Sequence, residues 1–132
     1  MDNNNSNKLT LTARVRSFRY AFVGIWTMIS SQHNAWIHAA ATLIVIITGA
    51  YFGLTKAEWC WIILAVTSVW TAETVNTAFE FLVDLVSPEY HPIAGKVKDV
   101  AAGAVLITAI GAALIGLVIM GPYALEKINS WR

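Results

Sequence analysis

Four polar side chains recur along one otherwise apolar stretch of the chain, "WTAETVNTAFEFLVDL", residues 70–85. They are Glu73, Asn76, Glu80 and Asp84. Because an α-helix advances about 100° per residue, these positions fall on one stripe within about 80° of arc. The residues between them are mostly apolar. The sequence therefore predicts one helix that carries an aligned row of three carboxylates and an amide.

Carboxylate and amide oxygens are hard ligands of the kind that Mg²⁺ prefers, and a buried glutamate is suited to general base catalysis. Further along lies the pair Lys98-Asp99, and a lysine can neutralise phosphate oxygens. The loop between the two motifs supplies Ser87, Glu89, Tyr90 and His91. Together these groups indicate phosphoryl transfer, in which catalysis consists mostly of positioning and charge stabilisation. The glycine-rich nucleotide motifs of soluble proteins are absent from the sequence.

The composition points to a lipid-facing surface. The chain has 132 residues, enough for one domain, of which 57% are hydrophobic and 13% charged. A soluble domain has about 45–50% apolar and about 25% charged residues. The net charge of +1 gives no reason to expect a nucleic-acid partner, and the single Cys60 excludes an internal disulfide.

Three long apolar segments are expected to be transmembrane helices, since a spanning helix needs about 20 apolar residues. They lie at about 35–54, 58–86 and 97–122. The fold class is therefore predicted to be an all-α membrane protein. An ionisable residue at the bilayer centre costs at least about 2.5–3.5 kcal/mol, so Glu73 is expected to mark a functional site facing a bundle interior. Asp84 could instead be only a charge at the end of its helix.

The Lys and Arg residues near the span ends predict the orientation. Six precede the first span or lie in the loop after the second: Lys8, Arg14, Arg16, Arg19, Lys96 and Lys98. Three lie on the other side: Lys56, Lys127 and Arg132. The N-terminus and the second loop are thus expected to face the cytoplasm, with residues 126–132 as a short periplasmic tail. Trp59 and Trp61 would then sit at the outer interface.

Before the first span, residues of about 13–32 mix basic and large apolar side chains, with Phe18, Phe22, Ile25 and Ile29 at helical spacing. This pattern predicts an amphipathic helix lying in the membrane surface. A cytoplasmic helix packed on the protein is the alternative. Residues 1–12 are polar, lack the apolar core of a signal peptide, and are expected to be a disordered N-terminus.

Small residues recur at every fourth position in the third span, at Ala104, Thr108, Ala112 and Gly116. The first span contains Gly49 and Gly53 as a G-x-x-x-G motif. Small residues let helix backbones approach closely in lipid, which predicts tight helix packing and an oligomer. They are also simply common in membrane helices.

The segment "AETVNTAFEFLVDLVSPEYHPIAGKVKDVAAGAVLI", residues 72–107, resembles the signature of the small bacterial membrane lipid kinases. These are the diacylglycerol kinase and undecaprenol kinase family. The motif E-x-x-N-[ST]-x-x-E-x-x-x-D followed by a K-D pair is long and specific. The resemblance covers roughly residues 14–122, with a surface helix and three spans in the expected order.

This resemblance implies a homotrimer with active sites shared between subunits, which transfers the γ-phosphate of MgATP to a lipid hydroxyl at the cytoplasmic interface. It implies that Glu73 is the base that takes the hydroxyl proton and that Glu80 is a ligand of Mg²⁺. The nucleotide site is expected to involve Tyr20, Asn76, Asp84, Glu89, Tyr90, His91, Lys98 and Asp99. Arg14, Asn34 and Ala102 are expected at the lipid substrate.

The chain departs from the family at Gln32, where a second metal-binding glutamate is usual. A glutamine oxygen can coordinate Mg²⁺ but brings no charge. Either the ATP phosphates and Glu80 suffice, or Asp84 or Asp99 compensates, or activity is reduced. We expect Gln32 to remain a metal ligand of weaker affinity.

The acceptor lipid is expected to be undecaprenol. Ala102 stands where the diacylglycerol-specific members tend to place serine, and Asn34 and His38 match the N-x-x-x-H variant of the pattern. Diacylglycerol or another lipid alcohol stays an alternative. A second class of function is non-enzymatic: a proton or cation pathway, or a degenerate kinase that serves as a scaffold. The Lys98-Asp99 pair argues against the pathway, which has no use for a phosphate site.

Overall fold

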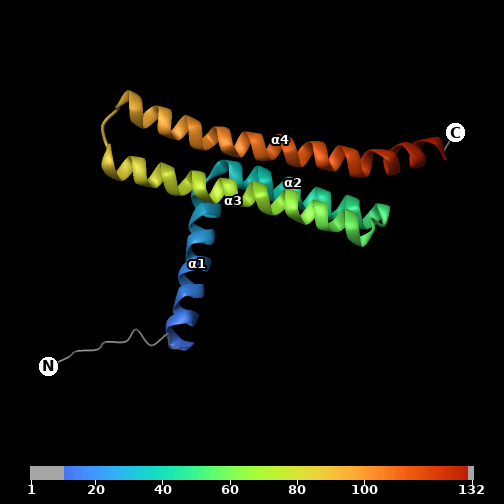
Figure 1. The fold of residues 1–132 in the computed structure, drawn as a ribbon, viewed down its shortest axis with the longest axis horizontal. Coiled ribbons are helices and arrows are strands. Elements are labelled where there is room, and N and C mark those ends of the chain that lie inside the picture. The colour runs from blue at the N-terminus through green and yellow to red at the C-terminus, as the bar shows by residue number, and fades with distance from the viewer. Residues whose placement is uncertain (1–10, 131–132) are drawn as a thin grey trace.

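A computed structural model describes residues 11–130, which form four α-helices without any strand in this range. They are α1 (Leu11–Ser31), α2 (His33–Phe52), α3 (Lys56–Val86) and α4 (Pro92–Asn129). α2, α3 and α4 run side by side, whereas α1 leaves this bundle at a steep angle (Figure 1). The all-helical expectation is confirmed. Most of the N-terminus expected to be disordered, residues 1–10, lies outside the described residues, and the first helix begins at Leu11.

Three of the helices are long and apolar enough to cross a membrane, as the sequence predicted. α2 has 20 residues, α3 has 31 and α4 has 38, and an 18-residue stretch of each has a mean hydropathy of 1.7, 1.2 and 2.5, respectively. At 1.5 Å per residue, α3 is about 46 Å long and α4 about 57 Å, while the hydrocarbon core of a bilayer is about 30 Å thick. Both helices must therefore extend beyond that core, which leaves room for polar residues at their ends.

The turn between α2 and α3 explains two glycines. Gly53 ends α2 in the left-handed conformation (φ 69°), which glycine adopts without steric cost. A Cβ at Gly49 would meet Leu54 Cδ1 and Trp59 Cη2 at 3.0 Å. Both glycines of the G-x-x-x-G motif thus have a structural role within one chain, and not only in contacts between chains. Thr55 then caps α3 through a capping box with Glu58.

α4 is longer at both ends than the span predicted at 97–122. It begins at Pro92 because His91 caps it, with Nδ1 accepting a hydrogen bond from Ile93 N at 3.2 Å. It also continues through Pro122. A proline inside a helix removes one backbone hydrogen bond but does not always end the helix. Tyr123 holds this last part, because its hydroxyl donates to Glu58 Oε2 at 3.0 Å and its ring stacks on Phe52. Residues 126–129 of the expected tail are therefore helical.

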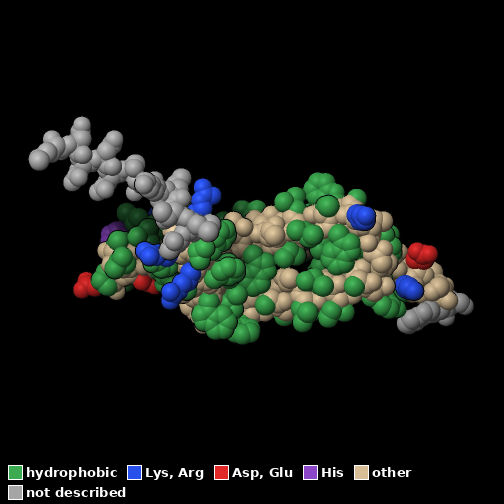
Figure 2. Space-filling view, turned by 90° about the horizontal axis from the view of Figure 1, so that it is seen from below, with side chains coloured by type: hydrophobic (Ala, Val, Ile, Leu, Met, Phe, Trp, Pro, Cys, Tyr) green, Lys and Arg blue, Asp and Glu red, His purple; other side chains and the backbone are tan. Residues whose placement is uncertain are grey.

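Few of the described side chains are fully buried, and many large apolar ones are exposed. On α2 these include Leu43, Ile44 and Ile47, each more than half exposed. Hydrophobic side chains cover the middle of the face in Figure 2, while charged side chains lie toward its two ends. An apolar surface of this extent marks contact with lipid or with other protein. On α1, Phe18 and Phe22 are likewise exposed; its position in the membrane surface stays a prediction.

Candidate functional site

The polar row on α3 begins with a fully buried carboxylate. Glu73 is 0% exposed, and Asn76 and Thr77 beside it are buried as well. Neither oxygen of Glu73, nor Oδ1 of Asn76, has a hydrogen-bond partner among the residues that the structure describes. A buried polar group without a partner is costly, so these three oxygens require an explanation beyond packing.

Asn76 connects this buried end of the row to Glu80, one helical turn further along. Its Nδ2 donates to Glu80 Oε1 at 2.9 Å. Glu80 is only half-buried, so the row passes from the interior of the bundle toward its polar end. Glu73, Asn76 and Glu80 thus lie along one helix as predicted, and a hydrogen bond joins Asn76 to Glu80 while Glu73 has no hydrogen-bond partner among the described residues.

Gln32 reaches this row from the corner between α1 and α2. Its backbone is extended (φ −108°, ψ 122°), and this one residue separates the two helices. Its Nε2 donates to Glu80 Oε2 at 2.7 Å. The corner of the chain is thereby joined to α3 at the level of Glu80. The Gln32 amide oxygen would face Glu80 only after the side-chain amide rotates so that its oxygen and nitrogen exchange places.

These side chains form a donor set that fits Mg²⁺ only with help from a substrate. No group of three or more His, Cys, Asp or Glu residues that could hold a metal occurs among residues 11–130. Glu80 supplies one carboxylate, and Gln32 and Asn76 contact it through their amide nitrogens, so their amide oxygens would reach a metal at Glu80 only after the amides rotate. Mg²⁺ typically takes one or two carboxylates and completes its shell with waters and substrate phosphates. The residues present therefore fit Mg²⁺ bound together with a phosphate ligand.

His38 is a neighbour of Glu73 that the sequence had not assigned to the site. Its Nε2 lies 3.8 Å from Glu73 Oε2, beyond hydrogen-bond length, and its side chain is largely buried. Its ring meets the edge of Trp70, whose Nε1 donates to Thr42 Oγ1 at 3.2 Å. The N-x-x-x-H pattern contained His38, but spacing alone did not show that α2 lays it against Glu73.

Asp84 does not join the buried row. Its Oδ1 accepts from Lys98 Nζ, an ion pair that links the end of α3 to the start of α4. Its side chain is 64% exposed, so water screens this pair. Asp99 is exposed in the same turn of α4. Asp84 lies about two helical turns after Asn76 on α3. The pair therefore places Lys98 of α4 at the polar end of the bundle.

The loop from Ser87 to His91 lies at the same end. Ser87 Oγ donates to the carbonyl of Glu89 at 3.1 Å, and Tyr90 is 90% exposed. His91 uses its Nδ1 to cap α4, as described above. These side chains border the polar end of the row without contacting it within this chain.

Four predicted site residues lie outside the hydrogen bonds and ion pairs described above. They are Arg14, Tyr20, Asn34 and Ala102, all exposed. Tyr20 precedes Gln32 by 12 positions, which is about 18 Å along a helix that points away from the bundle (Figure 1). A single chain therefore does not bring Tyr20 or Arg14 to Glu80.

The chain is similar to known proteins over most of its length. The family model described as prokaryotic diacylglycerol kinase matches residues 19–120. An undecaprenol kinase of Bacillus subtilis is 40% identical over 107 residues, covering 81% of this chain and 87% of that protein. A diacylglycerol kinase of Synechocystis is 41% identical over 103 residues, which cover 76% of this chain and 58% of that protein. A diacylglycerol kinase of Escherichia coli is 25% identical over 122 residues, covering 87% and 94%.

Proposed function

Since the chain belongs to the prokaryotic diacylglycerol kinase family and is a lipid kinase, we propose that it transfers the γ-phosphate of ATP to the hydroxyl of undecaprenol. Membership of a kinase family implies a nucleotide phosphate donor, and the apolar helices imply a membrane setting. The identity of the acceptor, the use of MgATP, the roles of the residues and the oligomer belong to the proposal.

One observation carries the proposal: the carboxylate of Glu73 is fully buried and has no hydrogen-bond partner among the described residues. A carboxylate placed at membrane depth without a hydrogen-bond partner is expensive and is by default functional. A base that must accept a proton from a lipid hydroxyl needs this position, because the hydroxyl stays close to the apolar part of the membrane. We assign Glu73 the role of that base.

In the proposed reaction Glu73 accepts the proton of the acceptor hydroxyl as the hydroxyl oxygen bonds to the γ-phosphorus. The bond from that phosphorus to the β–γ bridging oxygen breaks, and its electron pair leaves with ADP. Asn76 holds the carboxylate of Glu80 in place through its 2.9 Å hydrogen bond. The chain contributes mainly positioning, as is usual for phosphoryl transfer.

Glu80 is the proposed carboxylate ligand of Mg²⁺, and Gln32 a neutral second ligand whose amide turns to present its oxygen. When bound, Mg²⁺ would neutralise the charge that develops on the phosphate oxygens. The Gln32–Glu80 contact of 2.7 Å supports this assignment, because it brings both side chains to one point.

Lys98 is the proposed phosphate contact, and the neighbouring polar end of the bundle is the proposed nucleotide site. The residues assigned to it are Asp84, Glu89, Tyr90, His91 and Asp99. Lys98 must exchange its partner Asp84 for a phosphate oxygen. This exchange is inexpensive, since the pair is exposed and exposed ion pairs contribute only about 0–1 kcal/mol.

A homotrimer with shared active sites would bring α1 of one subunit to the site of another. Two observations support this part of the proposal. Tyr20 and Arg14 are exposed and too far along α1 to reach Glu80 of the same chain. The bundle also leaves large apolar side chains exposed, which a second subunit could cover. We place the site and the N-terminus on the cytoplasmic side of the inner membrane, following the distribution of Lys and Arg.

Diacylglycerol is the second candidate acceptor, because two of the relatives described above carry that name. The exposed Ala102 offers no hydroxyl to a polar lipid backbone, and this favours the simpler polyprenol alcohol. The deciding experiment supplies purified protein in micelles with labelled ATP, Mg²⁺ and either undecaprenol or diacylglycerol. Faster labelling of undecaprenol supports the proposal, preference for diacylglycerol corrects the acceptor, and transfer to neither lipid overturns it.

A further inference from the structure

The buried carboxylate of Glu73 has a basic neighbour on another helix. Among the basic side chains that the structure describes, only His38 of α2 approaches it to ion-pair distance, with Nε2 3.8 Å from Oε2. The polar groups beside Glu73 on α3 are directed elsewhere. Thr77 Oγ1 donates to the backbone carbonyl of Glu73 at 2.9 Å. Asn76 Nδ2 donates to Glu80. Of these neighbours, His38 is therefore the one placed to bind a carboxylate oxygen of Glu73.

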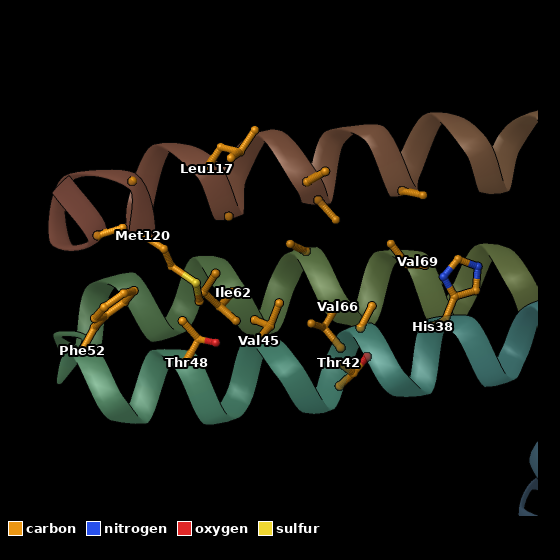
Figure 3. Close-up of a pocket in the computed structure, with 18 residues that line it drawn as sticks. His38, Thr42, Val45, Thr48, Phe52, Ile62, Val66, Val69, Leu117 and Met120 are labelled. Atoms are coloured by element: carbon orange, nitrogen blue, oxygen red, sulfur yellow. The ribbon is translucent and has the colours of Figure 1, made fainter. Parts of the chain in front are cut away.

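The ring of His38 is itself held between the two helices. Trp70 lies about one helical turn before Glu73 on α3, and its ring stands edge-to-face with the ring of His38, with the centroids 6.5 Å apart. Trp70 Nε1 donates to Thr42 Oγ1 at 3.2 Å. Thr42 follows His38 by four positions, so the two are neighbours on one side of α2 (Figure 3). His38 and Thr42 of α2 thus meet Trp70 and Glu73 of α3 as one interlocked group.

The separation of His38 and Glu73 is only slightly longer than a hydrogen bond. An N–H···O bond joins heavy atoms at about 2.9–3.0 Å, so Nε2 and Oε2 must approach by roughly 0.8 Å. Catalytic hydrogen bonds are often long in a protein without substrates and tighten in the reacting complex. The side chains of His38 and Glu73 are 17% and 1% exposed, so water competes little for either group.

We propose that His38, held by Trp70 and Thr42, is a positioning residue that orients the carboxylate of Glu73 through a hydrogen bond from its Nε2–H to Oε2. The inference rests on the proposed kinase function, in which Glu73 is the base. It requires the imidazole tautomer that carries a proton on Nε2. With Oε2 bound in this way, Oε1 is left to accept the proton of the acceptor hydroxyl. Orientation matters because a misplacement of about 1 Å can cost about 10²-fold in rate.

Removing the hydrogen bond between Trp70 and Thr42 tests this group at a distance from the carboxylate. Thr42→Val keeps the shape of the side chain but offers no acceptor to Trp70 Nε1, whereas Thr42→Ser keeps the hydroxyl and is the matched control. We expect Thr42→Val to lower kcat about threefold at an unchanged KM for ATP, because the base is less well aligned and the nucleotide site is untouched. Thr42→Ser should keep the kcat of the unaltered protein. Equal kcat values in the two variants would overturn the inference.

A double-mutant cycle shows whether Thr42 acts through His38. If it does, Thr42→Val should lower kcat in the unaltered protein and add no further loss in His38→Gln, because residues that act as one unit are not additive. Losses that multiply independently would overturn the inference, since Thr42→Val would then act without involving His38.

The contact itself is tested by a measurement that needs no turnover. Isotope-labelled histidine is observed by NMR in micelles with Mg²⁺ and a non-hydrolysable ATP analogue, and the signals of His38 are identified by their loss in His38→Gln. We expect Glu73→Ala to shift the Nε2 resonance of His38 away from its hydrogen-bonded value and to leave that of His33 unchanged. A His38 resonance that does not respond to Glu73→Ala would contradict the proposed contact. A response in a protein that phosphorylates no lipid would instead overturn the proposed function and leave the contact intact.

Discussion

Gln32 Nε2 donates a hydrogen bond of 2.7 Å to Glu80 Oε2, and this contact joins the corner between α1 and α2 to the polar row of α3. The two residues are 48 positions apart in the chain. The contact makes Gln32 part of the site despite its lack of charge. The contact also gives the carboxylate of Glu80 a hydrogen-bond donor.

Replacing Gln32 by glutamate should strengthen Mg²⁺ binding. A second carboxylate beside Glu80 adds attraction to the cation, and we expect the apparent Mg²⁺ affinity in the kinase assay to rise by roughly three- to tenfold. The same change removes the hydrogen bond and sets two carboxylates side by side, so the metal-free variant should unfold more easily. Gln32→Ala is the control and should weaken Mg²⁺ binding. An unchanged Mg²⁺ affinity in Gln32→Glu would count against a metal-binding role.

Glu73→Gln should abolish turnover while leaving the protein folded and able to bind ATP. The amide has nearly the same shape but cannot accept the hydroxyl proton, and a general base contributes about 10²–10⁴-fold. Single-turnover labelling of the lipid measures the chemical step, and binding of a fluorescent ATP analogue measures the nucleotide site. Normal turnover in this variant would show that another group is the base.

His38→Gln should lower kcat more than it raises the KM for ATP. His38 lies beside the carboxylate of Glu73 at 3.8 Å and is separate from the proposed nucleotide site, so we expect roughly a tenfold loss in kcat. His33→Gln is the matched control, since His33 is exposed at the start of α2. Equal effects of both substitutions would mean that His38 has no special relation to Glu73.

Lys98→Met and Asp84→Asn separate a phosphate contact from a structural ion pair. If Lys98 binds phosphate, Lys98→Met should raise the KM for ATP at least tenfold, whereas Asp84→Asn should leave Lys98 available and change the KM far less. If the exposed pair only links α3 to α4, both variants should lose similar, small amounts of stability. Steady-state kinetics with varied ATP distinguishes the two outcomes.

Gly53→Ala should destabilise the protein by about 1–2 kcal/mol. Gly53 ends α2 at φ 69°, and an L-residue with a Cβ is strained in this left-handed region. Gly24→Ala is the control, because Gly24 lies within α1 without a positive φ and should be neutral or slightly stabilised. Unfolding by titration with a denaturing detergent gives the free energies of both variants. An unaltered stability of Gly53→Ala would contradict the assigned role of this turn.

Much of the site follows from sequence because it lies on one helix. Glu73, Asn76 and Glu80 are related by helical periodicity, so their alignment required no tertiary information. His38 was missed as a neighbour of Glu73 because the two are on different helices. The pairing of Asp84 with Lys98 of α4 could not be predicted from helical periodicity either, since it joins two helices. The helix α4 extends beyond the span predicted at 97–122, because His91 caps it at its start and Tyr123 packs beyond Pro122.

The sequence by itself determined that this chain has three apolar spans and one polar row, because hydropathy and helical period are local properties. Only the tertiary structure decided that Gln32 contacts Glu80 and that His38 lies beside Glu73. These contacts depend on how separate helices pack against one another, and the apolar residues that allow such packing in lipid are compatible with many arrangements.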